Sequence, residues 1–169
     1  MTFSLRLMTA NDLVAVLAIQ SEYYAGKLIE PGDIILSRLR DFPETSWVAE
    51  DTGGVCAYLA AHPARLGQIS LLGHAFDSCT QPDSLYLHDM AVARRSGGRG
   101  VGTALTSMAW EKAQNDGLQH SSLVAIPSAI SYWLRSGYRA SCPSDELHIA
   151  RLKAYGDQAQ YMVRAFSDS

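Results

Sequence analysis

Hydrophobic residues recur along the chain at two spacings, one typical of strands and one typical of helices. Apolar runs of strand length occupy residues 3–8, 47–50, 55–61, 85–92, 122–126, a segment beginning at 138, and 161–166. Apolar residues at helical spacing occupy residues 9–20, 31–42, 101–115 and 129–135. The order β-α-α-β-β-β-α-β-α-β-β therefore predicts an α/β (α+β) fold, in which a mixed central sheet of about seven strands is flanked by about four helices.

Turn residues separate these segments and mark one irregular region. Residues 51–54, Asp-Thr-Gly-Gly, join two strand-like runs and predict a hairpin, because glycine permits the positive φ of a tight turn. Residues 63–82 have no sustained period and mix Gly, Ser, Asp and Pro, which predicts an irregular excursion that could shape a substrate pocket. We find no repeat or low-complexity tract and expect one domain over residues 1–169.

Composition and charge exclude several classes of partner. The chain has 47% hydrophobic and 18% charged residues, which suits a globular domain with a sizeable core. Its formal net charge of -3 offers no general attraction to nucleic acid or to a membrane of anionic lipid. The longest early apolar run, residues 13–19, is too short to span a bilayer, and no signal-like start precedes it. We therefore expect a cytoplasmic protein.

Cysteine and histidine spacing argues against disulfides and metals. Cys56, Cys79 and Cys142 are odd in number, far apart and without a CxxC pair, so reduced thiols are expected. The histidines show no ligand spacing with one another or with cysteine, so no metal site is expected.

A glycine-rich loop follows the strand-like run 85–92 and leads into a helical pattern. Gly98, Gly100 and Gly102 alternate there, and without a Cβ they allow a ligand to approach the backbone closely. Successive N–H groups can then converge on one anion, and the N-terminus of the helix adds partial positive charge. Further charge-assisted donors come from the neighbouring arginines Arg94, Arg95 and Arg99. The loop therefore predicts phosphate or diphosphate binding, with a plain flexible turn as the alternative.

Two other phosphate-binding loops do not fit. A dinucleotide fingerprint needs a third glycine where Thr103 stands and an acidic residue about twenty positions later, whereas residues 121–126 contain none. A P-loop needs a Gly-Lys pair followed by Ser or Thr, and no such sequence follows here.

Three segments in this order resemble motifs of the GCN5-related N-acetyltransferase (GNAT) superfamily. They are residues 85–92 (Leu-Tyr-Leu-His-Asp-Met-Ala-Val), 97–102 (Gly-Gly-Arg-Gly-Val-Gly) and 129–138 (Ala-Ile-Ser-Tyr-Trp-Leu-Arg-Ser-Gly-Tyr), within a motif core at 84–138. The resemblance implies the family's acyl-CoA acyltransferase fold, with a mixed, mostly antiparallel sheet and a bulge in the fourth strand. It also implies acetyl-CoA as co-substrate, and it allows a homodimer.

By this resemblance, the end of the fourth strand and the glycine loop bind acetyl-CoA through backbone N–H groups. The pantetheine arm and thioester carbonyl would be held by Met90, Ala91 and Val92. The diphosphate would be held by Gly97, Gly98, Arg99, Gly100, Val101, Gly102 and Thr103. The family pattern begins with Arg or Gln at the position of Gly97, so Arg95 or Arg99 would supply the missing side-chain contact.

Proton removal from the amine needs a catalytic side chain, because alkylamines are mostly protonated at neutral pH. The segment 85–92 also resembles the His-x-His segment of arylalkylamine N-acetyltransferases, with His88 at the second histidine and Tyr86 at the first. An imidazole can take up a proton near neutral pH, so His88 is the candidate base, directly or through water. A hydrogen-bonded structural histidine is the alternative.

A phenol would then protonate the departing thiolate. Tyr132 is the candidate acid, beside Trp133, which occupies the family's usual tyrosine position and could line the thiol pocket. Tyr155 is a further, looser candidate. Where the family's first helices border the acceptor site, this chain offers an aromatic wall with a carboxylate, formed by Tyr23, Tyr24 and Glu22.

The expected function is acetyl transfer from acetyl-CoA to the primary amine of a small molecule by direct attack on the thioester. One alternative is a non-catalytic acyl-CoA-binding sensor, favoured by departures from the family pattern at Gly97, Ile126 and Trp133. The other is a protein or peptide N-acetyltransferase, which shares the donor site but needs an open peptide groove. Acceptor loops vary most within a fold, so the sequence leaves this choice open.

Overall fold

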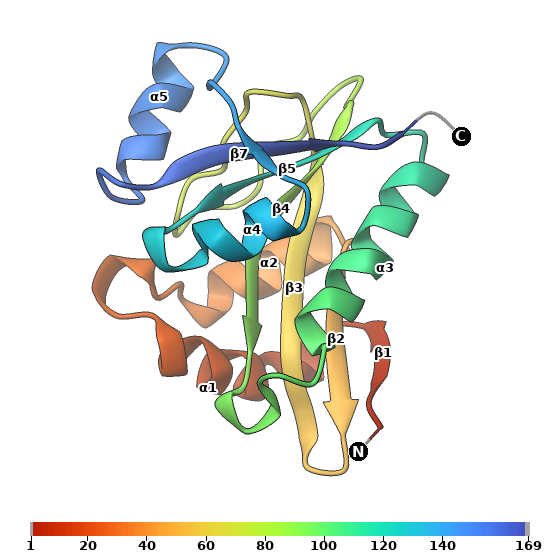
Figure 1. Cartoon of the computed structure of the whole chain (residues 1–169). Helices are drawn as coiled ribbons and strands as arrows, with labels where there is room; N and C mark the ends of the chain where they lie inside the picture. Colours follow the sequence, from red (N-terminus) through yellow and green to blue (C-terminus); the bar gives the residue numbers. More distant parts are fainter. Residues whose placement is uncertain (1, 168–169) are drawn as a thin grey trace.

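A single seven-stranded sheet forms the centre of the computed structural model, which describes residues 2–167 (Figure 1). The strand order is β1-β2-β3-β4-β5-β7-β6. The strands are β1 (Ser4–Leu7), β2 (Ser46–Asp51), β3 (Gly54–Ala64), β4 (Ser84–Val92), β5 (His120–Ala125), β6 (Arg139–Ala140) and β7 (Gln160–Ala165). All neighbouring strands are antiparallel except β4 and β5. The expected mixed, mostly antiparallel sheet is confirmed, while the ends of the expected domain, residues 1 and 169, lie outside the described residues.

Helices cover both faces of this sheet. They are α1 (Leu13–Tyr23), α2 (Gly32–Asp41), α3 (Val101–Asn115), α4 (Ile130–Arg135) and α5 (Glu146–Lys153), with 3-10 turns at Ala10–Asp12, Gly26–Leu28, Arg94–Ser96 and Pro127–Ala129. In the view of Figure 1, α1 and α2 lie behind the sheet, and α3 and α4 lie in front of it. Helices α1 to α4 were predicted, but α5 was not. Its N-cap is Asp145, whose carboxylate accepts a hydrogen bond from the N–H of His148, a capping pattern that the sequence does contain.

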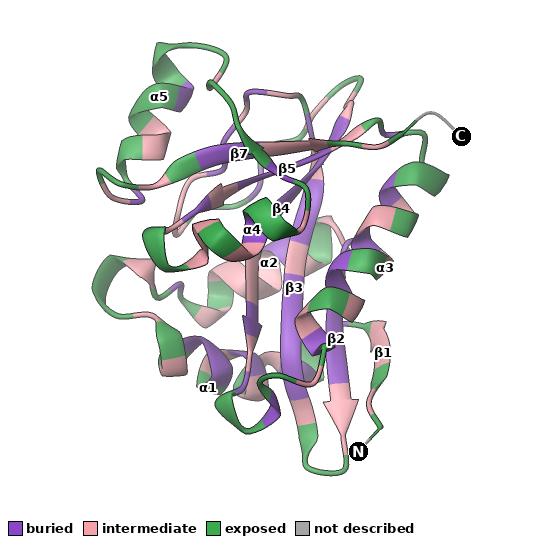
Figure 2. Ribbon diagram, viewed as in Figure 1, coloured by how far each residue is buried: buried purple, intermediate pink, exposed green. Residues whose placement is uncertain are grey.

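The core has one apolar layer on each face of the sheet. Helix α3 presents Leu105, Ala109 and Ala113 to the sheet at four-residue spacing, and all three have 0% exposure. On the other face, Val16 and Ile19 of α1 belong to a second buried cluster. Buried residues accordingly follow the strands and the inner sides of the helices (Figure 2).

Residues 65–83 form the irregular excursion between β3 and β4 that was predicted. A third apolar cluster lies beneath this excursion and α5, and includes Ile69, Tyr86 and Tyr155. Arg151 of α5 donates a hydrogen bond of 3.0 Å to the carbonyl of Ile69. The excursion is therefore fastened to the rest of the molecule and can form a stable wall for a pocket.

Strands β4 and β5 separate after a short stretch of pairing. Their register runs only from Ser84 opposite His120 to Leu87 opposite Leu123. Beyond Leu87, β4 continues to Val92 and pairs with β3 alone. The backbone of β4 therefore has no strand neighbour on its β5 side near its end, which leaves N–H and C=O groups for a ligand.

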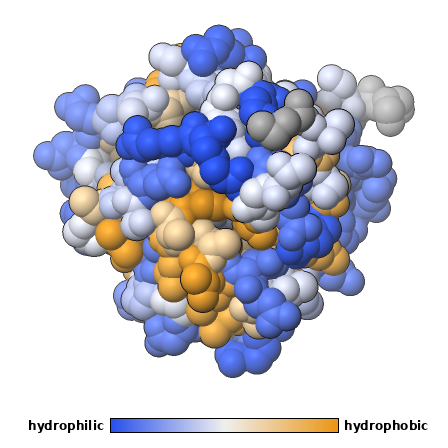
Figure 3. Space-filling model, turned by 90° about the horizontal axis from the view of Figure 1, so that it is seen from below, coloured by the Kyte–Doolittle hydropathy of each residue, from blue (hydrophilic) through white to orange (hydrophobic). Residues whose placement is uncertain are grey.

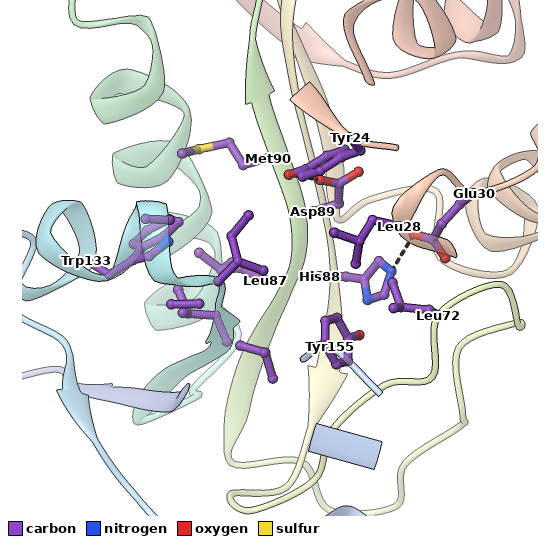
Figure 4. A pocket seen from close by; sticks show the side chains of 15 residues that line it. Tyr24, Leu28, Glu30, Leu72, Leu87, His88, Asp89, Met90, Trp133 and Tyr155 are labelled. Carbon is purple, nitrogen blue, oxygen red and sulfur yellow. Dashed lines mark hydrogen bonds and ion pairs between the residues drawn. The ribbon is translucent and has the colours of Figure 1, made fainter. Parts of the chain in front are cut away.

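A β-bulge in β4 sets the direction of two polar side chains. Ala60 of β3 lies opposite Asp89, and the next residue, Ala61, lies opposite Leu87, so His88 is an extra residue on β4. An extra residue breaks the alternation of side chains along a strand. His88 and Asp89 consequently lie on the same side of β4, whereas Leu87 and Met90 lie on the other side (Figure 4).

Candidate functional site

A groove of about 630 Å³ runs along the end of β4, the glycine loop and the first turn of α3. It is lined by Tyr23, Tyr24, Met90, Ala91, Val92, Ser96, Gly97, Gly98, Gly100, Val101, Gly102, Thr103, Ile126, Ser128, Ala129, Tyr132 and Trp133. The lower face of the molecule, where the glycine loop lies in Figure 1, carries an apolar area with hydrophilic residues around it (Figure 3). We name this cavity the donor groove.

The glycines of the loop have the backbone geometry that an anion cradle needs. Gly98 and Gly100 have φ values of +73° and +77°, which residues with a side chain rarely adopt, and Gly100 directly precedes α3. A Cβ on Gly102 would lie 3.4 Å from the hydroxyl of Tyr132 and 3.5 Å from Cγ2 of Val92. Position 102 therefore borders the groove, and any larger side chain would extend into it.

The arginines of the loop have protein partners in this structure. Arg95 and Arg99 form ion pairs of 2.7 Å and 2.9 Å with Asp51 of β2, and neither lines the donor groove. The hydrogen bond from Arg95 and then that from Arg99 hold the pKa of Asp51 well below its usual range. These pairs attach the glycine loop to the β2–β3 hairpin, and the expected phosphate contacts of both arginines stay predictions.

Tyr132 and Trp133 occupy different depths. Trp133 is 7% exposed, and its ring packs edge-on against Tyr138 with a centroid distance of 5.2 Å. It lines the donor groove and also a second, inner cavity. Tyr132 lines only the groove, and its hydroxyl lies beside Gly102. Successive residues of a helix point about 100° apart, so these two neighbours face different regions.

The inner pocket, a cavity of about 110 Å³, lies where β4 and β5 separate (Figure 4). Its lining is Tyr24, Leu28, Glu30, Leu72, Leu87, His88, Asp89, Met90, Leu123, Val124, Ala125, Ile126, Ala129, Trp133 and Tyr155. Five residues line both cavities, namely Tyr24, Met90, Ile126, Ala129 and Trp133. The two cavities therefore adjoin, and a long ligand in the groove can place its end beside the inner pocket.

His88 lines the inner pocket with one ring nitrogen paired and the other free. Its side chain is 1% exposed, and Nε2 lies 2.6 Å from Oε1 of Glu30. Burial raises the pKa of Glu30, but the hydrogen bonds and charges of His88 and Arg38 outweigh it and hold this pKa well below the usual range. Glu30 is thus a carboxylate that only accepts, so Nε2 must donate. Nδ1 has no hydrogen-bond partner among the described residues and is left to accept a proton.

Glu30 is held by a buried network. Its second oxygen, Oε2, accepts hydrogen bonds from Arg38 Nη2 and from the N–H of Gly73. The side chain of Gln20 pairs with the backbone N–H and C=O of Glu30 at 3.1 Å each. Glu30 was not among the predicted site residues, because a glutamate before Pro-Gly is typical of a helix start and its partner lies 58 positions away.

Asp89, the second residue of the bulge, is held by two phenols. Tyr58 donates to Oδ2 at 2.6 Å, and Tyr24 donates to Oδ1 at 3.0 Å. Burial raises the pKa of Asp89, although the hydrogen bond from Tyr58 opposes this effect. Of the three residues expected to form an aromatic wall, Tyr24 lines both cavities, and its contact with an acceptor stays a prediction.

The other expected wall residues lie elsewhere. Glu22 accepts a hydrogen bond from the N–H of Arg94 at 2.7 Å, and the guanidinium of Arg94 lies over the ring of Tyr23. Tyr23 lines the donor groove only, and Glu22 lines neither cavity. Tyr155 lines the inner pocket, but its hydroxyl donates to the carbonyl of Ser70 at 2.7 Å.

Residues 2–167 contain neither a metal-binding cluster nor a membrane-spanning helix. No cluster of three or more His, Cys, Asp or Glu side chains there has an arrangement that could hold a metal ion. Within the same residues, no helix has the length and apolar character needed to cross a membrane.

Comparisons with solved structures give the same fold. Ard1 from Thermoplasma volcanium has a TM-score of 0.75 at 16% identity, over 99% of this chain and 100% of that chain. PaiA N-acetyltransferase from Thermoplasma acidophilum, in complex with coenzyme A, has a TM-score of 0.69 at 10% identity, over 98% and 100%. A ribosomal-protein alanine N-acetyltransferase from Escherichia coli has a TM-score of 0.66 at 15% identity, over 99% and 96%. At these identities the likeness shows the fold alone.

Sequence comparison identifies the family. No curated protein gives a significant match to the chain. The model of the acetyltransferase (GNAT) family matches residues 13–138, which is well over half of the chain and includes the bulged strand, the glycine loop and α4. The chain therefore belongs to the acetyltransferase (GNAT) family of acyltransferases.

Proposed function

We propose that this chain transfers the acetyl group of acetyl-CoA to the primary amine of a small molecule. The observation that carries the proposal is the buried, unpaired Nδ1 of His88 in a pocket adjoining the donor groove. A base at this junction can take the ammonium proton beside the thioester carbon. The inner pocket, at about 110 Å³, favours a small acceptor over a peptide. Cytoplasmic location and a homodimer stay predictions.

Acetyl-CoA binding is supported by the geometry of the groove. Its lining includes the glycine loop and the N-terminus of α3, where N–H groups and the helix dipole favour a diphosphate. We expect the pantetheine arm along residues 90–92. The acetyl end would then lie near Met90 and Trp133, which line both cavities.

The reaction requires two protons to leave the ammonium nitrogen, one before and one after attack, and one proton to reach the sulfur. Nδ1 of His88 takes a proton from the ammonium, and the neutral nitrogen attacks the thioester carbon. A C–N bond forms, and the nitrogen then releases its second proton to water. The C–S bond breaks, and the coenzyme A thiolate takes a proton from a phenol, which water reprotonates. Tyr132 is the predicted donor, and Tyr24 is a second candidate. Burial and then the charge of Asp89 raise the pKa of Tyr24, which keeps it protonated at neutral pH.

An acceptor panel separates this function from its two alternatives. The protein is incubated with acetyl-CoA and small amines, dipeptides or lysine peptides, and free thiol is measured against hydrolysis without acceptor. Faster turnover of peptides than of small amines would favour a protein acetyltransferase. Tight coenzyme A binding without transfer to any acceptor would favour a sensor.

Replacement of His88 by glutamine is expected to lower kcat about 100- to 10,000-fold, because the variant lacks the base that removes the ammonium proton. Free-thiol release measures this loss, and calorimetry with coenzyme A is expected to give unchanged affinity. His120→Gln serves as a control, since His120 lines neither cavity. Equal kcat values for His88→Gln and the wild type would exclude His88 as the base.

A further inference from the structure

Asp89 carries a carboxyl group that no cationic side chain among the described residues contacts directly. It forms no ion pair with a Lys, Arg or His side chain among residues 2–167. Its hydrogen bonds come from the neutral hydroxyls of Tyr24 and Tyr58. Taking a carboxylate out of water without a cation is costly, so such a group calls for a positively charged partner.

The neighbouring charges do not supply that partner. Glu30 is saturated by Arg38, His88 and the N–H of Gly73, so the Arg38 guanidinium is already paired. His88 lies next to Asp89 in the bulge, but its Nε2 pairs with Glu30 and not with Asp89 (Figure 4). A cation in direct contact with Asp89 would therefore be a ligand, and Asp89 lines the inner pocket, where a ligand could reach it.

His88 provides a second polar group in the inner pocket that lacks a partner. The side chain of His88 is 1% exposed and lines the inner pocket, yet its Nδ1 has no partner among the described residues. A buried ring nitrogen without a partner is unusual in proteins. A group that both donates a hydrogen bond and carries positive charge suits an unpaired ring nitrogen and a carboxylate, and an ammonium group does both.

The rest of the inner pocket is apolar and small. Its walls include Leu28, Leu72, Leu123 and Val124, and no Lys or Arg lines it. A cavity of about 150 Å³ holds benzene in a protein core. The inner pocket, at about 110 Å³, fits a substituent smaller than that ring.

We propose that Asp89 binds the ammonium group of the acceptor, and that the acceptor is a compact primary monoamine with an apolar substituent smaller than benzene. This substrate class rests on the proposed amine acetylation. Asp89 holds the ammonium in the pocket that His88 also lines, and His88 takes the proton, directly or through water, before the nitrogen attacks the thioester. The carboxylate of Asp89 thus makes the pocket prefer a charged amine over a neutral one.

Binding measured apart from turnover tests this proposal. NMR titrations of the protein saturated with coenzyme A compare ethylamine with trifluoroethylamine, which has a similar shape but is largely neutral at neutral pH. In the wild type, ethylamine is expected to bind about 10- to 100-fold more tightly, the range of a hydrogen bond to a charged partner. Equal affinities would overturn the proposal without any variant.

Asp89→Asn is expected to weaken ethylamine binding about 10- to 100-fold and to leave trifluoroethylamine and coenzyme A binding nearly unchanged. Asp116→Asn, at the exposed end of α3, is the control. An unchanged ethylamine affinity in Asp89→Asn overturns the proposal, as does tighter wild-type binding of a dipeptide than of butylamine.

Thiol release in the same samples separates the two proposals. Ethylamine binding that depends on Asp89 without acetyl transfer would refute the proposed function and leave the ammonium site standing. Acetyl transfer to small amines that is insensitive to Asp89→Asn would do the reverse.

Discussion

Replacement of Glu30 by glutamine is expected to lower kcat at least about 100-fold while leaving coenzyme A affinity unchanged. Glu30 touches neither reacting atom and acts through His88, so it is a positioning residue. Its carboxylate accepts the Nε2–H of His88, which leaves Nδ1 as the proton acceptor. Glutamine has nearly the same shape but carries two donors on one of its terminal atoms.

The surrounding network decides which way the glutamine amide would turn. Arg38 and the N–H of Gly73 both donate to Oε2, so the amide oxygen has to occupy that position. The NH₂ group would then face His88 Nε2, which would have to accept. The ring proton would move to Nδ1, and the pocket would lose its base although the imidazole remained.

Three measurements check the Glu30 prediction. Thiol release gives kcat, nitrogen NMR of the imidazole reports which nitrogen of His88 is protonated, and thermal unfolding verifies that the variant is folded. Glu44→Gln is the matched control, because Glu44 is exposed and does not line the inner pocket. A Glu30→Gln enzyme with normal kcat and the proton on Nδ1 would refute the assigned role of Nδ1.

Gly102→Leu is expected to weaken coenzyme A binding about 100-fold or more. A Cβ at position 102 would already contact the Tyr132 hydroxyl, Val92 and Met90 at 3.4 to 3.6 Å. The remaining carbons of leucine can extend only into the donor groove, where we expect the coenzyme. Position 102 lies within α3 and has no positive φ, so the backbone tolerates the substitution.

Gly102→Ala is the control that distinguishes the effect of filling the groove from the effect of losing glycine. Its single added carbon makes ordinary van der Waals contacts, and alanine favours a helix over glycine by about 1 kcal/mol. Calorimetry is therefore expected to give an affinity within a few-fold of the wild type, together with a raised Tm. Wild-type affinity in a folded Gly102→Leu protein would remove the donor groove as the coenzyme A site.

Much of the fold was readable from local patterns. The strand, glycine loop and helix unit at 85–115 was predicted because apolar periodicity and turn chemistry act over neighbouring residues. The family was also evident, because its motifs lie in short continuous segments. Helix α5 was missed despite its Asp145 cap, because eight residues give little periodicity.

The contacts of individual side chains were harder to predict from the sequence. Arg95 and Arg99 were expected to face phosphates, and the structure pairs them with Asp51, more than 40 positions earlier. Charge near a glycine loop indicates an anion site, but the direction of an arginine depends on which carboxylate the sheet brings beside it.

By itself, the sequence determined the order of the elements, the glycine cradle and His88 as the candidate base. Only the tertiary structure decided which nitrogen of His88 is free and that Asp89 lies on the same side of the sheet. The physical reason is that both depend on packing between segments far apart in the sequence. The register of the β-bulge depends on β3, and the free nitrogen of His88 depends on Glu30, 58 positions away. Neither can be predicted from periodicity along the chain.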